Sequence, residues 1–326
     1  MSSIENFLTS FQNDLYAKVN GTQKWWVKSL FHFSDISNAI PIIENEAIYS
    51  REKAIELKLM ENDNANDEVI ARTSSVHKKY ARLYFGPSTP TQKNNEGIKP
   101  ITKIVNNAHC PIPIMFIFDF KKVFLLNEIR FTDGNLATNP TIYKNVNGLE
   151  NLDFNLIYHR SWFYPEYRDE IVNARHSEIL IKDELKLENN LRLIAVRSKA
   201  EKETLLYQLS DKLKDKYQSK IYVQPQTGIF INDWLYVDEV SIIDNYINIL
   251  WHKCSNTTSC EDAYKLNISI KKEDGIIKKL EQENWYIDKS LQKLKIPKEF
   301  IKQDFIITIL INNIKAYTNL IKVTND

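Results

Sequence analysis

Glycine is scarce in this chain of 326 residues, which contains only seven. None of them belongs to a GxGxxG or a GxxxxGK motif, the glycine-rich loops that hold phosphates in Rossmann and P-loop nucleotide sites. The sequence therefore argues against both kinds of site, and side chains must hold any nucleotide that binds. The motifs HExxH and CxxC are also missing, so we expect no catalytic metal.

Cysteine and long apolar runs are scarce as well. The three cysteines, Cys110, Cys254 and Cys260, match no metal-binding spacing, and their odd number favours a reducing cytoplasm over a disulfide framework. No apolar run approaches the ~20 residues of a membrane span, and the polar N-terminus is unlike a signal peptide. We therefore expect a cytoplasmic protein without membrane contact. The net charge is only +1, so any surface for nucleic acid is a local patch.

Hydrophobic periodicity predicts an α+β protein with a mixed sheet, flanking helices and enough length for two domains. Ser198 followed by Glu201 is a capping-box signature for a helix. The character changes after Asp233, where strand-like segments precede Lys- and Ile-rich segments that we expect to be helical. We therefore predict a main domain over 1–232 and a smaller α+β extension over 233–326. The strands expected in the main domain include 81–85, 112–120, 123–126, 178–181, 191–196 and 228–231.

The segment 156–181 combines a basic, aromatic loop with a carboxylate. It reads LIYHRSWFYPEYRDEIVNARHSEILI, and Glu178 begins the apolar strand that follows the loop. Such a loop suits nucleic acid, and a buried acid beside it suits chemistry on that nucleic acid. The ordinary alternatives are a surface loop whose rings pack on the core and a solvated glutamate at a strand end.

Two upstream stretches carry further polar candidates. His32 ends an apolar run and is followed by Ser34 and Asn38, which favours hydrogen bonds to a ligand, although a histidine there is also a common structural residue. Tyr80, Arg82 and Tyr84 share one face if 80–84 is a strand. That face suits stacking on a planar ring and balancing a phosphate, although an exposed edge strand has the same pattern.

Taken together, four blocks resemble the DarT family, the DNA ADP-ribosyltransferase toxins of DarTG toxin–antitoxin systems. They are LFHFSDISNAIPIIE, VHKKYARLYFGPSTP, RFTDGNLA at 130–137, and NARHSEILI through QTGIFI, in the same order and spacing over roughly 25–231. The resemblance implies an ADP-ribosyltransferase fold, NAD as substrate, no metal, and transfer of ADP-ribose onto a base of single-stranded DNA. It also implies a macrodomain antitoxin, similar to DarG, as partner.

The resemblance also assigns residues. Glu178 matches the family's catalytic glutamate, and Arg72 falls where the family has a catalytically important arginine that also belongs to the NAD site. GPSTPTQ replaces the family's more usual proline-and-methionine ending of the Tyr84 strand, and residues after 232 have no aligned counterpart. The remaining NAD-binding residues are His32, Ser34, Asn38, Tyr80 and Tyr84, and the expected DNA-binding residues are His159, Arg160, Tyr164, Tyr167, Arg168 and Arg175.

Several hypotheses stay open at this point. The acceptor is single-stranded DNA in the leading hypothesis, and RNA or protein in a second one with the same chemistry. A third is a catalytically inactive module that only binds nucleic acid, in which Glu178 is structural. Thymine and guanine are both open as the modified base, and the role of 233–326 is undetermined.

Overall fold

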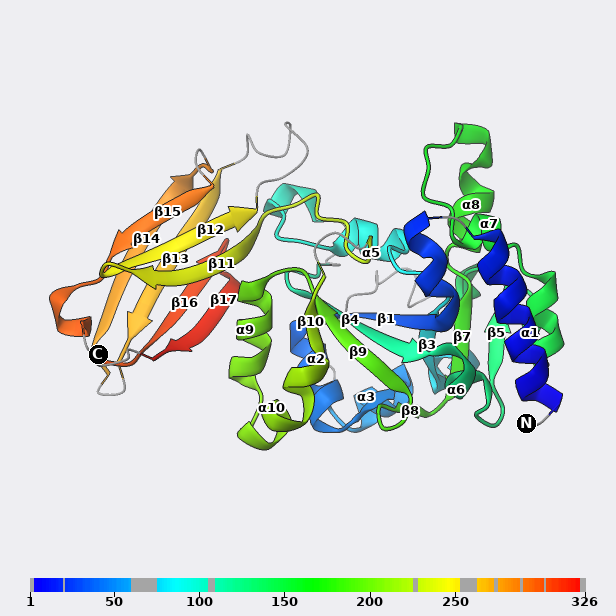
Figure 1. Cartoon of the computed structure of the whole chain (residues 1–326). Helices are drawn as coiled ribbons and strands as arrows, with labels where there is room; N and C mark the ends of the chain where they lie inside the picture. Colours follow the sequence, from blue (N-terminus) through cyan, green and yellow to red (C-terminus); the bar gives the residue numbers. More distant parts are fainter. Residues whose placement is uncertain are drawn as a thin grey trace. The chain divides into compact units, whose positions relative to one another are not determined.

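The computed structural model describes residues 3–19, 21–59, 75–104, 109–224, 228–252, 263–272, 275–287, 290–301 and 303–322 (Figure 1). It confirms the α+β class. Arg72, Cys254 and Cys260 lie outside the described residues, so their predicted roles stay predictions. The chain divides into two compact units, the first comprising 1–94, 115–194 and 227–229, and the second 95–114, 195–226 and 230–326. The boundary that we expect near 232 remains a prediction.

The largest sheet has the strand order β10-β9-β4-β1-β3-β7-β5-β6. Strand β4 is its most apolar member, with six of the seven residues in PIMFIFD buried. The neighbours β1, β3, β7 and β5 pair in antiparallel fashion, which brings segments far apart in sequence together. The strands are β1 (Ser29–Asp35), β3 (Tyr80–Tyr84), β4 (Pro113–Asp119), β5 (Arg130–Thr132), β6 (Ile142–Tyr143), β7 (Glu178–Lys182), β9 (Leu191–Val196) and β10 (Ile221–Val223).

Short helices surround these strands, and a two-stranded sheet pairs β2 (Ala47–Tyr49) with β8 (Glu184–Lys186). Local capping sets where several helices begin. The Asp35 carboxylate, for example, accepts from the backbone of Ser37 and starts the helix after β1. The helices before β9 are α1 (Ser3–Lys18), η1 (Gly21–Lys28), α2 (Ile36–Glu44), α3 (Arg51–Glu56), η2 (Ser75–Lys79), α5 (Pro90–Asn95), η3 (Ile101–Lys103), α6 (Phe120–Phe124), η4 (Leu136–Thr138), η5 (Val146–Asn151), α7 (Phe154–Ile157), η6 (Pro165–Tyr167) and α8 (Arg168–Ala174).

The predicted strand over 123–126 is wrong. Asp119 accepts a hydrogen bond from the backbone N–H of Lys122 at 3.0 Å, which caps the helix α6 directly after β4. An aspartate at this position satisfies an otherwise unpaired N–H of the first helical turn. The apolar residues Val123 and Phe124 are buried, but they belong to this helix and not to a strand.

In the second unit, two further sheets have the orders β11-β12-β15 and β14-β13-β16-β17. The Lys- and Ile-rich segments that we expect to be helical are strands, so that prediction is wrong. In β16, which reads FIITILI, buried and partly exposed residues alternate, and this is the period of a sheet with one face on a core. The elements are α9 (Lys199–Gln208), α10 (Asp211–Tyr217), η7 (Gln218–Lys220), β11 (Tyr236–Ile243), β12 (Tyr246–His252), β13 (Tyr264–Lys271), β14 (Ile277–Trp285), β15 (Leu291–Lys295), η9 (Lys298–Phe300), β16 (Phe305–Ile311) and β17 (Ile314–Ile321).

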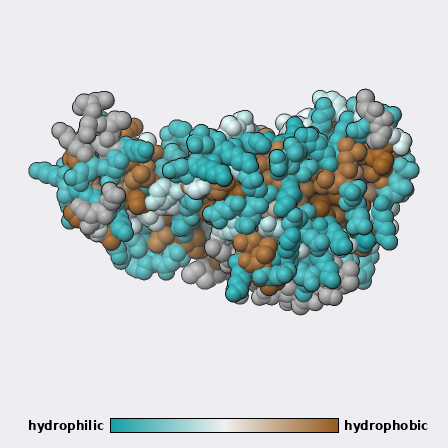
Figure 2. All heavy atoms as spheres, turned by 90° about the horizontal axis from the view of Figure 1, so that it is seen from below, coloured by the Kyte–Doolittle hydropathy of each residue, from teal (hydrophilic) through white to brown (hydrophobic). Residues whose placement is uncertain are grey.

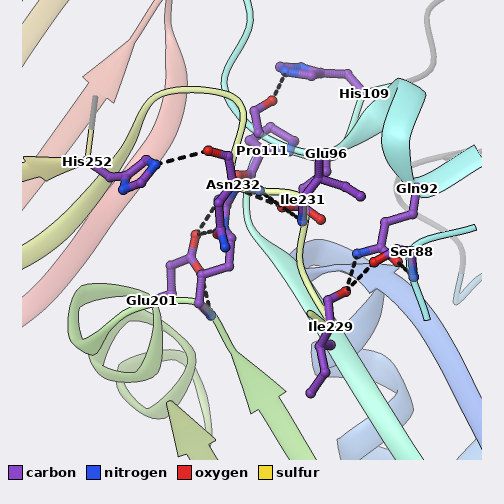
Figure 3. Close-up of polar contacts among 12 residues, drawn as sticks. Ser88, Gln92, Glu96, His109, Pro111, Glu201, Ile229, Ile231, Asn232 and His252 are labelled. Atoms are coloured by element: carbon purple, nitrogen blue, oxygen red, sulfur yellow. Dashed lines mark hydrogen bonds and ion pairs between the residues drawn. The ribbon is translucent and has the colours of Figure 1, made fainter. Parts of the chain in front are cut away.

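A buried charge cluster lies at the start of α9. Ser198 caps the helix by accepting from the Glu201 N–H, as the capping-box motif predicts. The Glu201 carboxylate, however, binds the fully buried Arg197 through its backbone N–H and its guanidinium, instead of closing the box on Ser198. Glu96 lies 3.6 Å from the same guanidinium and accepts from the backbone N–H of Ile231 at 2.9 Å (Figure 3).

Residues 228–231 do not form the predicted strand. Side chains, not a neighbouring strand, bind part of their backbone. In the first unit, the Ile229 carbonyl accepts from the Gln92 side chain at 2.8 Å (Figure 3). In the second unit, the Ile231 N–H donates to Glu96. These side-chain bonds satisfy the backbone groups without a sheet ladder.

The face shown in Figure 2 is predominantly hydrophilic, with hydrophobic side chains in separate patches. Among the helices in the described ranges, none is long and apolar enough to cross a membrane.

Candidate active site

Strand pairing places three of the predicted active-site residues, Tyr80, Tyr84 and Glu178, on one face of the sheet. In the antiparallel pair of β3 and β7, Tyr84 lies opposite Glu178 and Tyr80 lies opposite Lys182. Opposed residues of an antiparallel pair project to the same side, and so do residues two apart. Arg82, midway between the two tyrosines, therefore shares this face with Glu178.

The Glu178 carboxylate is buried, with 2% of the residue exposed, and its two oxygens have different surroundings. The Tyr84 hydroxyl donates to Oε1 at 3.3 Å, and Nη1 of Arg82 lies 3.5 Å from the same oxygen. Oε2 is also buried but has no hydrogen-bond partner among the described residues. A buried carboxylate oxygen without a donor is costly, which is typical of a position that a ligand completes.

The electrostatics of the site follow from this burial. Desolvation raises the pKa of Glu178, and the charge of Arg82 together with the hydroxyl of Tyr84 opposes that rise. Burial also raises the pKa of Tyr84, so its hydroxyl stays protonated and remains a donor. Arg82 therefore favours the ionised form of a carboxylate whose burial favours the neutral form.

The backbone of Glu178 is held by Thr132 of β5. The Glu178 N–H donates to Oγ1 of Thr132 at 2.9 Å, and that hydroxyl donates to the Gly134 carbonyl at 2.7 Å. Thr132 is fully buried. Its single hydroxyl thus links the start of β7 to the turn after β5. These two hydrogen bonds fix the position of the Glu178 backbone, from which the carboxylate projects.

His32 and Ser34 lie on β1, beside β3. Nδ1 of His32 is 2.9 Å from the carbonyl of Arg82, and since a carbonyl only accepts, Nδ1 carries the proton. Burial lowers the pKa of His32, which favours the neutral ring with Nε2 as an acceptor. Ser34 is buried and donates to the Asp35 carbonyl at 3.3 Å, and Asn38 lies on α2. The predicted NAD-binding roles of these three residues stay predictions.

Tyr80 lies at the opposite end of β3 from Tyr84. The guanidinium of Arg130, from β5, lies 5.5 Å from the centroid of the Tyr80 ring. The two tyrosines that we expect to bind NAD thus have different neighbours, because Tyr84 contacts the carboxylate and Tyr80 contacts a cation. Their roles toward NAD remain predictions.

The loop between α7 and β7 presents exposed rings. Trp162, Tyr164 and Tyr167 are 74%, 57% and 53% exposed, and the Trp162 and Tyr164 rings meet edge to face at 4.5 Å. Arg168, at the start of α8, is exposed as well. Exposed rings beside an exposed cation suit a single strand, because bases stack on the rings and the cation contacts the backbone.

Two other basic residues of this loop donate hydrogen bonds to backbone carbonyls of the protein. Arg160 donates to the Gly228 carbonyl and Arg175 donates to the Ser88 carbonyl. The Ser88 hydroxyl donates to the Gly228 carbonyl at 2.9 Å, so both arginines reach one connected set of turns. His159 is partly buried against Phe163, with ring centroids 5.6 Å apart. The predicted DNA contacts of His159, Arg160 and Arg175 are untested.

Two residues of this site, Thr132 and Arg130, were missed as candidates, and Arg82 was a candidate for balancing a phosphate but not as the partner of Glu178. Arg82 has a signal in the sequence, since it alternates with Tyr80 and Tyr84. Thr132 and Arg130 belong to the RFTDGNLA run but join the site only through the pairing of β5 with β7.

No group of three or more His, Cys, Asp and Glu side chains within the described ranges is arranged to hold a metal ion.

A match to a family model shows which family the chain belongs to. The model described as ssDNA thymidine ADP-ribosyltransferase, DarT, matches residues 31–231, which is more than half of the chain. The chain belongs to the DarT family. The match confirms the resemblance seen in the four sequence blocks, and with it an NAD-dependent ADP-ribosyltransferase acting on single-stranded DNA.

Solved structures of DarT proteins are similar as well. The Thermus sp. 2.9 DarT in complex with ADP-ribosylated ssDNA is 15% identical, with a TM-score of 0.49 over 61% of this chain and 95% of that one. The same protein in complex with NAD+ has a TM-score of 0.47 at 15% identity, over 61% and 96%. The Thermosipho africanus DarTG in complex with ADP-ribose is 13% identical, with a TM-score of 0.46 over 67% and 54%. No curated protein sequence matches the chain.

Proposed function

We propose that this DarT family member transfers ADP-ribose from NAD to thymidine in single-stranded DNA, with Glu178 as the catalytic residue. The observation that carries this proposal is the buried Oε2 of Glu178, which has no hydrogen-bond donor among the described residues. Its other oxygen is bound by Arg82 and Tyr84. One oxygen is therefore held by the protein, and the second lacks a donor that a substrate hydroxyl would supply.

The reaction makes a positive centre that a carboxylate stabilises. The bond between C1′ of the ribose and the nicotinamide nitrogen breaks, and its electron pair leaves with nicotinamide. The ribose becomes oxocarbenium-like, and Oε2 of Glu178 stabilises that charge and accepts from a ribose hydroxyl. The thymine base then bonds to C1′, and the proton it loses passes to the carboxylate, which releases it to water.

His32 and Tyr84 prepare the NAD side of the site. The neutral His32 ring has Nε2 as an acceptor for a hydroxyl or amide of NAD. Ser34 and Asn38 follow on the same segment, from the end of β1 into α2. The ring of Tyr84 lies beside the carboxylate, where it stacks on nicotinamide and holds it in a reactive pose. Arg72 is assigned to phosphate or acceptor binding by the family resemblance alone.

The loop from His159 to Arg175 reads the acceptor strand. Tyr164 and Tyr167 stack on bases, and each base stacked on an aromatic side chain contributes ~1 to 3 kcal/mol. Arg168 contacts the backbone phosphates. A single strand exposes its base edges, so no base flipping is needed.

We also propose the biological setting of a toxin. By family, the partner that restrains it is a macrodomain antitoxin similar to DarG, which removes ADP-ribose from DNA, and the site of action is the cytoplasm. The Thermosipho africanus protein of this kind is named DarTG, which supports such a partnership.

The test is direct transfer to an oligonucleotide. Purified protein, NAD and a thymidine-containing oligonucleotide should give a mass gain of one ADP-ribose with release of nicotinamide, and Glu178→Gln should lower the rate at least about a thousandfold. Glu184→Gln, a partly exposed glutamate on the neighbouring strand β8, is the matched control and should keep the rate. If the wild-type protein modifies no oligonucleotide but labels RNA or protein in a lysate, the acceptor proposed here is wrong.

A further inference from the structure

Past Glu178, the sheet face of the active site continues into a row of basic side chains. Arg82 of β3 and Arg130 of β5 lie opposite the same residue of β7. Lys182, two residues further along β7, lies opposite Tyr80. Since residues two apart on a strand project to the same side, all of these side chains share the face of Glu178.

Two of these cations have no acidic partner within the described ranges. Arg82 is paired with Glu178, but neither Arg130 nor Lys182 forms an ion pair there. Arg130 is partly buried and rests on the ring of Tyr80, 5.5 Å from its centroid. A stacked guanidinium is pre-organised, because the ring restricts its rotamers while its N–H groups remain available.

Burial changes along this face. Glu178 is buried, Arg82 and Arg130 are partly exposed, and Lys182 at the far end is exposed. A ligand that places one end against the carboxylate therefore passes the arginine row before it reaches solvent. A partly desolvated cation without a counter-charge gains most from a bound anion, and arginine binds phosphate oxygens in pairs.

This inference rests on the proposed function, in which NAD binds at Glu178. The spacing of successive rows of side chains along the strands suits the length of NAD. Rows on one face of a strand are about 6.6 Å apart, since each residue advances about 3.3 Å. In NAD the pyrophosphate follows the nicotinamide ribose directly. Arg130 lies one row from the carboxylate that meets the ribose, and the long, exposed side chain of Lys182 begins one row further on. We propose that Arg130 and Lys182 bind the pyrophosphate of NAD, and that Tyr80 holds the Arg130 guanidinium for this contact.

Binding of ADP-ribose and of nicotinamide by calorimetry tests the proposal on the full chain. ADP-ribose contains the pyrophosphate, and nicotinamide does not. Arg130→Gln should weaken ADP-ribose binding about tenfold, the usual effect of losing a charge-assisted hydrogen bond, and leave nicotinamide binding unchanged. Lys182→Gln should weaken it a few-fold. Tyr80→Leu should weaken ADP-ribose binding less than Arg130→Gln does, because it removes only the ring that holds the Arg130 guanidinium.

Lys122→Gln is the matched control, since Lys122 is exposed on α6 and should leave all affinities unchanged. Arg130→Lys keeps the charge and should recover part of the ADP-ribose affinity, which separates lost binding from lost folding. Unchanged ADP-ribose binding in Arg130→Gln would overturn the proposal. So would a loss confined to oligonucleotide binding, because the row would then contact the DNA backbone.

The outcome is separable from that of the proposed function. If the wild-type protein modifies the oligonucleotide but Arg130→Gln binds ADP-ribose as tightly as the wild type, only the proposal for Arg130 and Lys182 is contradicted. A wild-type protein that binds ADP-ribose through Arg130 but modifies no DNA contradicts only the acceptor.

Discussion

Nη1 of Arg82 lies 3.5 Å from Oε1 of Glu178, so a cation in the middle of β3 is paired with the buried carboxylate that begins β7. The pair leaves Oε2 without a donor in the described part of the chain. With Glu178 as the proposed catalytic residue, we expect Arg82 to act on the reaction through it, by orienting the carboxylate and by favouring its ionised form.

The first prediction concerns Arg82→Gln and the pH dependence of transfer. Burial raises the pKa of Glu178 and the Arg82 charge opposes that rise, so removing the charge lets the pKa rise further. The reaction needs the ionised carboxylate, so the acid limb of the kcat profile should move to higher pH. The loss of rate should be larger at the acid end of the profile than at the alkaline end.

Arg82→Lys restores a positive charge at that position and should return the acid limb most of the way to its wild-type place. If Arg82→Gln lowers the rate equally at every pH, the arginine does not act on the protonation of Glu178.

The second prediction concerns Thr132. Thr132→Val keeps the shape of the side chain but removes the hydroxyl that accepts from the Glu178 N–H. A buried N–H without an acceptor costs about 1 to 3 kcal/mol, so the melting temperature and kcat should both fall. Thr132→Ser retains the hydroxyl and should stay near the wild type in thermal unfolding and in single-turnover rate. Equal losses in the Val and Ser variants would show that the methyl group, and not the hydroxyl, matters.

The third prediction concerns Tyr164 and Tyr167. Both rings are more than half exposed, so replacing either with alanine should leave the melting temperature unchanged. Each variant should raise KM for the oligonucleotide about tenfold, the value of one lost stacking contact, with KM for NAD unchanged. Steady-state rates with each substrate varied in turn measure both constants. A variant with normal KM for DNA would remove that ring from the acceptor surface.

The fourth prediction contrasts Arg175 with Arg168. Arg175 donates to the Ser88 carbonyl, so Arg175→Ala should destabilise the fold by about 1.5 to 3 kcal/mol and impair both substrates. Arg168 is exposed on α8, so Arg168→Ala should keep stability, weaken oligonucleotide binding and reduce the salt dependence of that binding. Binding isotherms at several salt concentrations, beside thermal melts, separate the two roles. Equal stability of both variants would contradict the structural role of Arg175.

The sequence predicts the parts of the site that depend on local patterns. Glu178 at the start of an apolar strand and the alternation of Tyr80 with Tyr84 follow from the period of a strand. The contacts of Arg82 and Thr132 with Glu178 depend on the register between distant strands, which no local pattern encodes.

The same limit applies to the fold. Composition suggests a strand over 123–126, but one side chain, Asp119, starts a helix there. The Lys- and Ile-rich composition around 305–311 led us to predict a helix. The structure shows a strand there, in which buried and partly exposed residues alternate. Pairing with β13 and β17 decides in favour of the sheet.

Nuclease digestion of a modified mixed-sequence oligonucleotide, followed by mass spectrometry of the nucleosides, tests the central claim most directly. Wild-type protein with NAD should yield thymidine bearing one ADP-ribose and no other modified nucleoside, and Glu178→Gln should yield none. ADP-ribose on guanosine, or equal modification by Glu178→Gln, would contradict the account.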